Sequence, residues 1–219
     1  MSSSAGEKKR KIGVDEASDI VFEYTGNGQI VPKNVVDNVI HVRFHPSVIE
    51  VEEKAFMDCI KVKVVVMNDG LNIIGDRAFW KCYSLQSINI PSSVTKINSW
   101  AFYWCKCLRE VVLNEGLREI GGKAFCECTS IERITTPSTV VEIGEFAFMK
   151  CVRLRELVFS EGMKKIGFNA LEGCTSLENI SIPSTVVEIG NYAFSGCSNL
   201  REVVIHNEEI QIGDNPFDR

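Results

Sequence analysis

Four cysteines in the middle of the chain have a spacing that would suit a metal ion. Cys105 and Cys107 form one C-x-C pair, and Cys126 and Cys128 form a second pair further along. Four thiolates are a common ligand set for structural Zn²⁺. The alternative is that some of these thiols fill an apolar core, where a free cysteine behaves as a small hydrophobic group. The positions of the other cysteines decide between the two.

A 23-residue period runs through most of the chain and accounts for seven of the nine cysteines. An Ala-Phe pair recurs at this spacing from Ala55-Phe56 to Ala193-Phe194, with one Ala-Leu copy. The cysteines that keep the same period are Cys59, Cys82, Cys105, Cys128, Cys151, Cys174 and Cys197. Repeats of this length form stacked coils, because a single unit cannot bury its own apolar face. We therefore predict that these seven thiols lie in the core, and we favour no metal site.

Enzymatic chemistry has few candidate groups in this sequence. The chain has three histidines, His41, His45 and His206, and none lies near a nucleophile motif. The glycines are isolated, one in most repeats, so no phosphate-binding loop is present. We predict no catalytic residues and no cofactor, and hence a protein that is not an enzyme.

Composition narrows the class of partner. The net charge is −5, and a basic run at Lys8–Lys11 leaves the remainder of the chain acidic. An acidic body does not favour nucleic acid, which needs clustered Lys and Arg. No apolar run is long enough for a transmembrane helix, and no secretory signal is seen. We expect a cytoplasmic protein with free thiols, with Lys8–Lys11 either a solvated tail or a nuclear import signal.

Each repeat contains two patterns that predict its elements. Leu85, Ile88 and Ile90 end in the alternation of a short strand with one buried face. Ala101, Cys105 and Leu108 fall on one stripe of a short helix. The sequence thus predicts an α/β solenoid with a parallel sheet on one face and short helical turns on the other. The glycine before each helical segment, or Asn98 in one coil, is expected to have a left-handed backbone.

The repeats resemble the BspA-like class of leucine-rich repeats. The stretch of residues 174–194, CTSLENISIPSTVVEIGNYAF, follows the pattern of that class throughout. The resemblance covers roughly residues 39–217 and implies a right-handed leucine-rich-repeat superhelix that acts as a binding scaffold. It implies no catalytic residues. Some relatives are surface proteins, so a cell-surface adhesion module is the alternative function.

The chain divides into three parts. Residues 1–17 are expected to be a disordered basic tail, and residues 18–44 an N-terminal cap containing a β-hairpin that turns at Gly26-Asn27-Gly28. Residues 45–219 hold seven full repeats and a partial eighth. At the C-terminal edge, either Pro216-Phe217 folds over the open core or another chain covers it, which would allow self-association.

Two surfaces are candidates for binding a protein partner. On the helical face, aromatic and Met side chains depart from the repeat, and they are expected to form a convex patch opposite the core: Trp80, Trp100, Tyr103, Trp104, Phe146 and Met149. Cys126 lies in the same outward column. On the sheet face, Val112, Val158 and Val204 alternate with polar residues along one column. Beside them runs a ladder of alternating charges, which is expected to keep the sheet soluble.

Turn sequences add a longer, 46-residue period. The turns read PSSV, NEGL, PSTV, SEGM and PSTV in succession, so every second coil is alike. A glycosylation sequon, Asn179-Ile180-Ser181, lies on an outward strand, and a glycan there would favour the adhesion alternative. The sequence names neither the partner nor the surface that binds it.

Overall fold

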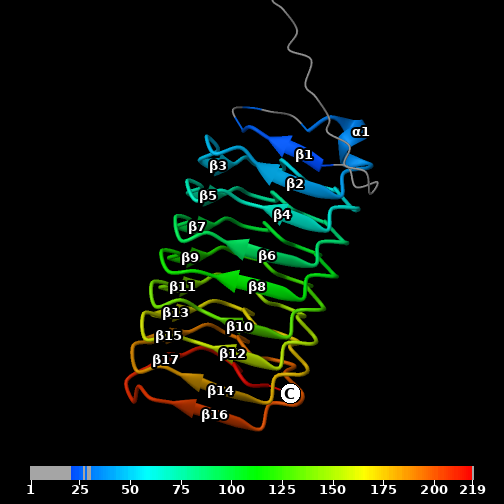
Figure 1. The fold of residues 1–219 in the computed structure, drawn as a ribbon. Coiled ribbons are helices and arrows are strands. Elements are labelled where there is room, and N and C mark those ends of the chain that lie inside the picture. The colour runs from blue at the N-terminus through cyan, green and yellow to red at the C-terminus, as the bar shows by residue number, and fades with distance from the viewer. Residues whose placement is uncertain (1–20, 27, 29–30, 219) are drawn as a thin grey trace, which may run out of the picture.

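The computed structural model describes residues 21–26, 28 and 31–218, which form a stack of parallel coils (Figure 1). The leucine-rich-repeat solenoid predicted from the sequence is confirmed, with one coil for each 23-residue repeat. The predicted tail at residues 1–17 lies outside the described residues, and so does Lys8–Lys11.

Most coils contribute two strands, which stack into two rows. The long-strand row consists of β1 (Val21–Tyr24), β2 (His41–Phe44), β4 (Val64–Val66), β6 (Ser87–Ile90), β8 (Glu110–Leu113), β10 (Arg133–Thr135), β12 (Glu156–Val158), β14 (Asn179–Ile182) and β16 (Glu202–Ile205). The short-strand row consists of β3 (Glu50–Val51), β5 (Ile73–Ile74), β7 (Lys96–Ile97), β9 (Glu119–Ile120), β11 (Glu142–Ile143), β13 (Lys165–Ile166), β15 (Glu188–Ile189) and β17 (Gln211–Ile212).

The core is built from columns of identical side chains. Phe79, Phe102 and Phe125 are fully buried and stack nearly parallel, with ring centroids 5.2 and 5.1 Å apart. The seven cysteines of the repeat are buried beside them, as the sequence predicts. Each thiol after the first donates a hydrogen bond into the preceding coil; for example, Cys105 Sγ lies 3.2 Å from the carbonyl oxygen of Phe79. A weak S–H donor therefore helps to satisfy a backbone carbonyl where no water can reach.

The predicted helical segments are wrong, because the segment after each recurring glycine position is a turn ribbon. Alternate amides leave the coil: Trp100, Phe102 and Trp104 N–H groups bond carbonyls of the next coil at 2.9, 2.7 and 3.0 Å. The amides between them bond locally, as Tyr103 N–H does to the carbonyl of Trp100. An α-helix would use all these amides internally. Stacking therefore takes precedence over the helical period of the sequence, and the α/β description does not hold.

The left-handed backbone lies at other positions than predicted. The recurring glycines of the repeat and Asn98 do not have positive φ. Positive φ occurs instead at the residue before each repeat Ala and at the residue three after it, for example Trp100 (64°) and Trp104 (63°). The glycines are required for space: a Cβ atom on Gly144 would lie 2.7 Å from the backbone nitrogen of Gly122 in the preceding coil.

The predicted N-terminal hairpin falls partly on residues 27, 29 and 30, which lie outside the described residues, so it stays a prediction; the described part of the cap joins the solenoid. β1 pairs in parallel with β2, in the register of the other coils, and the short helix α1 (Lys33–Val36) lies between them in the chain. Tyr24 is fully buried, with its ring centroid 4.9 Å from that of Phe56. Burying this ring requires β1 to join the solenoid as its first strand. Asn27, at the predicted turn, lies outside the described residues.

From β6 onward, strand pairing in the long-strand row follows the 46-residue period. β6 pairs with β8, β10 with β12, and β14 with β16, each over three or four residues. Among the described residues, β8 does not pair with β10, nor β12 with β14, although these strands are neighbours in the stack. The short-strand row is continuous over all eight of its strands. Before the first interruption, β1, β2, β4, β6 and β8 form one continuous sheet, in which a single residue pair joins β4 to β6. The grouping of coils in twos therefore begins at β6 and affects the long-strand row alone.

Candidate binding surfaces

The first interruption of the long-strand row opens a hollow of about 540 Å³ between β8 and β10. Its lining residues are Arg109, Glu110, Val111, Val112, Leu113, Glu132, Arg133 and Thr135. Val111 and Leu113 face the core, yet they are only half-buried, whereas the equivalent Ile88 and Ile90 are fully buried. Because the strands are unpaired here, apolar side chains of the core become accessible from the sheet face.

A second hollow, of about 310 Å³, lies at the next interruption, between β12 and β14. Its lining residues are Arg155, Glu156, Leu157, Val158, Asn179, Ile180, Ser181, Glu202 and Val204. The predicted sheet-face residues Val112, Val158 and Val204 are all exposed, at 40, 44 and 38%. The structure thus brings Val158 and Val204 to one hollow and places Val112 in the other.

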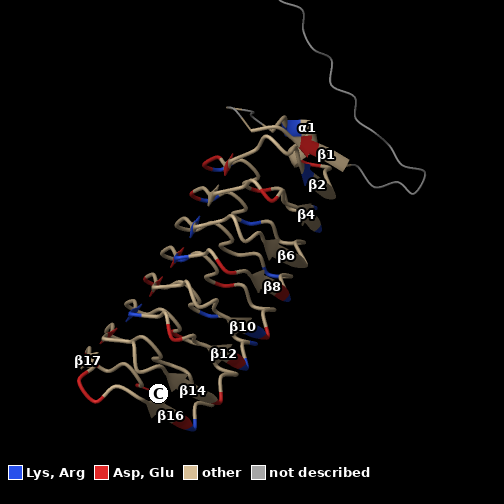
Figure 2. Cartoon of the chain, turned by 60° about the vertical axis from the view of Figure 1, so that its left-hand side comes forward, with Lys and Arg blue, Asp and Glu red and all other residues tan. Residues whose placement is uncertain are grey.

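Charges on the sheet face are paired across one group of two coils. Arg133 Nε lies 3.4 Å from Glu156 Oε2, across the paired strands β10 and β12. Figure 2 shows positive and negative segments interleaved along the stack. An exposed pair of this kind contributes about 0–1 kcal/mol. The alternating charges therefore make the sheet face polar but add little to the stability of the fold.

The aromatic residues predicted as a convex patch form an aromatic–cation cluster instead of a bare apolar surface. Trp80, Trp100, Tyr103 and Trp104 are all half-buried. The Tyr103 centroid lies 5.1 Å from both Trp100 and Trp104 and 6.3 Å from Trp80. These rings, together with Arg77, Lys81, Lys106 and Lys123, make up the cluster.

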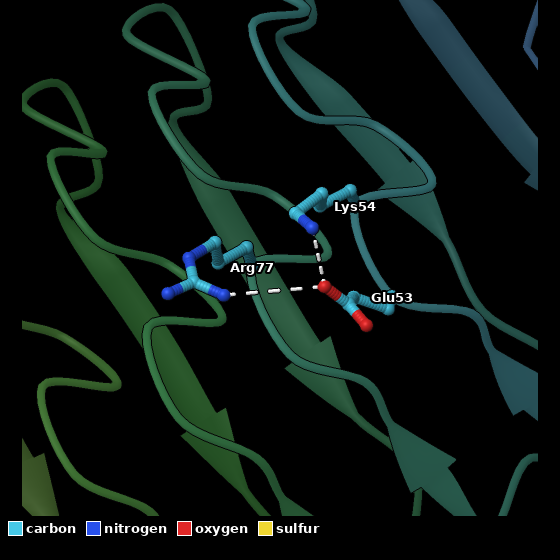
Figure 3. A network of polar contacts seen from close by, with 3 residues as sticks. All are labelled: Glu53, Lys54 and Arg77. Carbon is cyan, nitrogen blue, oxygen red and sulfur yellow. Dashed lines mark ion pairs between the residues drawn. The ribbon is translucent and has the colours of Figure 1, made fainter.

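Cations cover the ring faces of this cluster. Lys81 Nζ lies 4.0 Å from the Trp80 centroid, and Lys123 Nζ lies 4.2 Å from that of Trp100. At its N-terminal end, Arg77 and Lys54 both approach the carboxylate of Glu53 (Figure 3). A partner would therefore meet ring edges and ammonium groups at this surface. Such contacts contribute about 0.5–1 kcal/mol each at exposed sites.

The remaining predicted aromatic-face residues lie at the margin of the cluster. Phe146 is half-buried, 4.8 Å from Lys123 Nζ and 5.1 Å from the Phe168 ring. Met149 is also half-buried. Cys126, expected on the outside with them, is 2% exposed, which corrects that expectation, and burial raises the pKa of its thiol to about 12.

The geometry does not assemble the four cysteines considered for zinc. Cys105 and Cys128 bond backbone carbonyls in the core, while Cys107 is exposed. Within the described residues, no group of three or more His, Cys, Asp or Glu side chains is arranged to hold a metal ion.

Comparison with known proteins assigns the family. A family model described as "BspA type Leucine rich repeat region" matches residues 34–140 and 118–219, with six copies. The chain belongs to this family. No curated protein matches it.

Solved structures of leucine-rich repeat proteins share the fold. The T. pallidum leucine-rich repeat protein TpLRR has a TM-score of 0.62 and 23% identity, with 98% of this chain and 88% of that chain covered. A leucine-rich cell surface protein from Faecalibacterium prausnitzii has a TM-score of 0.46 and 22% identity, covering 78% of this chain and 61% of that one. The former similarity shows the fold of this BspA-type chain.

Sequence reasoning missed the hollows as well as the cations of the cluster. The 46-residue period of the turns was a signal for the hollows, because it coincides with the interruptions between strands. Val111 and Leu113 cannot be distinguished in the sequence from other core residues, because they occupy positions that are apolar in the other repeats as well. In the described part of the chain, no helix has the length and apolar character needed to span a membrane.

Proposed function

We propose that this BspA-type chain is a non-enzymatic scaffold that binds a protein through the long-strand face. The observation that carries this proposal is the pair of hollows at the strand interruptions, where Val112 and Val158 are exposed. In the first hollow the half-buried core residues Val111 and Leu113 lie beside Val112. Apolar depressions inside a polar rim are typical of sites that receive anchor side chains of a partner.

The aromatic–cation cluster is the second candidate surface for the same function. Its rings are already stacked between coils and covered by cations, so little apolar area remains for a partner to bury. The hollows, in contrast, have volumes in the range that takes up ligand or side-chain groups. We therefore rank the long-strand face first.

The test uses valines that the structure matches in exposure. Val112→Lys with Val158→Lys places charge in both hollows, whereas Val141→Lys with Val187→Lys places the same charges beside the short-strand row, where these valines are 44 and 52% exposed. Partners are identified first with the unaltered chain by proximity labelling. We expect the hollow variant to lose them and the control variant to keep them, with equal melting temperatures.

The outcomes separate the two surfaces. A variant with Lys81→Glu and Lys123→Glu reverses two cations of the aromatic–cation cluster and leaves the hollows unchanged. If that variant loses the partners while the hollow variant retains them, the long-strand face is not the binding surface. If all variants retain them, neither surface binds.

Adhesion at a cell surface is the alternative role, and exposed Asn179 is the residue that bears on it. Asn179 begins the sequon and also lines the second hollow. A glycan at this position would fill that hollow, so glycosylation and partner binding there exclude each other. Mass spectrometry of the protein from its native source distinguishes them; an unmodified Asn179 is expected for the cytoplasmic scaffold that we propose.

A further inference from the structure

Exposed valines recur in every second coil along the long-strand face. The valine column consists of Val66, Val112, Val158 and Val204, and the residues at the same position in the coils between them are Asn89, Thr135 and Ser181. The four valines are 51, 40, 44 and 38% exposed. The face therefore presents one apolar contact point for every two coils, and the two hollows lie along this column.

The stacked core rings give the spacing of these contact points. Phe102, Phe125 and Phe148 are nearly parallel, with successive ring centroids 5.1 and 5.4 Å apart. Because parallel copies of one side chain are displaced by the same step as their coils, two coils advance by about 10.5 Å. The coils follow a nearly straight axis in both views (Figures 1 and 2). The valine column is thus a line of apolar points with steps of about 10.5 Å.

Among the regular conformations of a peptide, the α-helix matches this step. Seven residues of an α-helix rise about 10.5 Å and return a side chain to the same face within about 20°. Side chains on one face of a β-strand recur at about 6.6 and 13.2 Å, so neither spacing fits. A polyproline II helix repeats at about 9.3 Å, and its mismatch grows to about 3.6 Å over the three steps from Val66 to Val204.

Carboxylates lie on both sides of the valine column, in the same coils as the valines. Two residues before a valine, at the start of the strand, are Glu110, Glu156 and Glu202. Three residues after a valine, in the following turn, are Asp69, Glu115 and Glu161. All six side chains are exposed. A partner segment lying on the valines would therefore have acidic groups along both of its flanks.

The protein itself neutralises few of these carboxylates. Arg133 pairs with Glu156, with 3.4 Å between Nε and Oε2. Glu115 accepts hydrogen bonds from the amide and the hydroxyl of Ser138, at 3.0 and 2.8 Å, and both donors are neutral. Within the described residues, Glu110 makes no ion pair. The arginines of the same strands lie one residue farther from the valines than the glutamates do: Arg109, Arg155 and Arg201.

We propose that the long-strand face binds an amphipathic α-helix of its partner, laid along the stack, with an apolar residue at every seventh position and Lys or Arg on both flanks of that stripe. The apolar residues enter the hollows at Val112 and Val158, and the cations meet carboxylates such as Glu110 and Glu115. A helix that lays its apolar face into a groove is a recurring mode of peptide recognition. This inference rests on the proposed function and specifies the partner segment that contacts the face.

The probes are synthetic, fluorescently labelled peptides of about 28 residues, the length of four heptads. The first has Leu at every seventh position, Lys three and four residues after each Leu, and Ala or Gln elsewhere, so that the lysines flank the leucine stripe. The second has the same residues with Leu at every sixth position, which distributes the leucines around the helix. The third has Leu at every third position between prolines, which favours a polyproline II helix.

Fluorescence anisotropy with the 219-residue chain measures binding of each peptide. We expect the first peptide to bind at least about tenfold more tightly than the other two, and to gain helical circular dichroism when bound. The variant with Val112→Lys and Val158→Lys should lose this binding, and the control variant with Val141→Lys and Val187→Lys should keep it. Equal binding of the first two peptides, tighter binding of the third, or unchanged binding to the hollow variant would overturn the inference.

A fourth peptide tests the charges without altering the protein, so its result does not depend on how any variant folds. It is the first peptide with Glu in place of every Lys, and it should bind at least about tenfold more weakly than the first. Equal binding of these two peptides would contradict the role of the carboxylates.

The inference and the proposed function fail in different ways. If the first peptide does not bind, but the hollow variant still loses the partners found by proximity labelling, the long-strand face binds proteins without such a helix. In that case the inference is wrong and the proposed function stands. If the hollow variant keeps those partners and also binds the first peptide, both are wrong.

Discussion

At the scale of single residues, the fold depends on backbone conformations that most side chains avoid. Each coil has a left-handed residue before its Ala and another three residues after it, and these positions hold Lys, Asp, Arg, Glu and even Trp. Among the described residues, glycine occupies the second position in two coils, at Gly173 and Gly196. A left-handed backbone costs an ordinary L-residue about 1 kcal/mol, and a bulky ring more. The coil accepts this cost because the conformation directs alternate amides to the next coil.

Lys150→Gly should therefore stabilise the protein. Lys150 is exposed with a φ of 57°, in the same column as Gly173. We expect a gain of about 1 kcal/mol in the free energy of unfolding, or a rise of about 2–4 °C in Tm. Arg153→Gly is the control, because Arg153 is exposed without a positive φ and should lose stability. Equal losses in both variants would contradict this explanation.

The buried thiols predict a loss of stability in alkali. Burial raises the pKa of Cys59 to about 12 from its ordinary value of 9.0. The folded state thus binds this proton more tightly than the unfolded state, so the stabilisation is complete below pH 9 and is lost as pH rises toward 12. Between about pH 8 and 10, Cys59→Ala should lose about 1 kcal/mol less than the unaltered chain. Urea unfolding at the two pH values measures this, and parallel losses would disprove it.

At the scale of elements, close approach between coils determines which residues are tolerated. Gly144 and Gly122 are near neighbours but differ in space: a Cβ atom on Gly122 would meet nothing closer than 3.4 Å, whereas one on Gly144 would meet backbone at 2.7 Å. Backbone atoms of a stacked coil cannot move aside alone. The glycine that recurs in the repeat at the position of Gly144 is therefore a packing requirement.

Gly144→Ala and Gly122→Ala form a matched pair that tests this requirement. Gly144→Ala should lower the free energy of unfolding by about 1–3 kcal/mol, through separation of two coils. Gly122→Ala should change it little. Chemical denaturation of both variants gives the comparison; if Gly122→Ala is the more harmful change, steric crowding at Gly144 is not the reason for the glycine.

The sequence predicted the features that recur in every repeat, such as the buried columns. It did not predict the features that depend on how one coil stacks on the next, such as strand pairing. Phe102 and Cys105 were assigned to the core correctly, because burial repeats with their column. The spacing of Ala101, Cys105 and Leu108 predicted a helix wrongly. The same spacing also fits a turn ribbon whose amides bond the next coil. The position of Val112 on the sheet face follows from alternation. That it lies at an unpaired strand does not, since pairing depends on coil-to-coil geometry.

At the scale of the whole molecule, stability comes from contacts between neighbouring coils, so the ends should be weaker than the middle. The Phe125 amide and the Gln211 amide make inter-coil hydrogen bonds of 2.8 and 2.9 Å. Their surroundings differ, because Phe125 is fully buried, whereas Ile212, next to Gln211 in the chain, is 47% exposed.

Hydrogen exchange should therefore separate these two amides despite their similar bonds. We expect Gln211 to exchange at least about tenfold faster than Phe125 at low protein concentration, through opening of the terminal coil alone. Exchange measured by NMR or mass spectrometry resolves the two. Equal rates would mean that the stack opens as one cooperative unit.

The grouping of coils in twos has a consequence for how such a chain can change length. Gly116 and Gly162 lie directly over Ser92 and Ser138, where a Cβ atom would approach a carbonyl oxygen to 2.0 and 1.8 Å. Each of these glycines thus leaves the space that the serine turn beneath it occupies. Losing a single 23-residue coil would bring two turns of the same kind together, while losing two would restore the fit. Duplication and deletion in this gene should therefore proceed in steps of 46 residues.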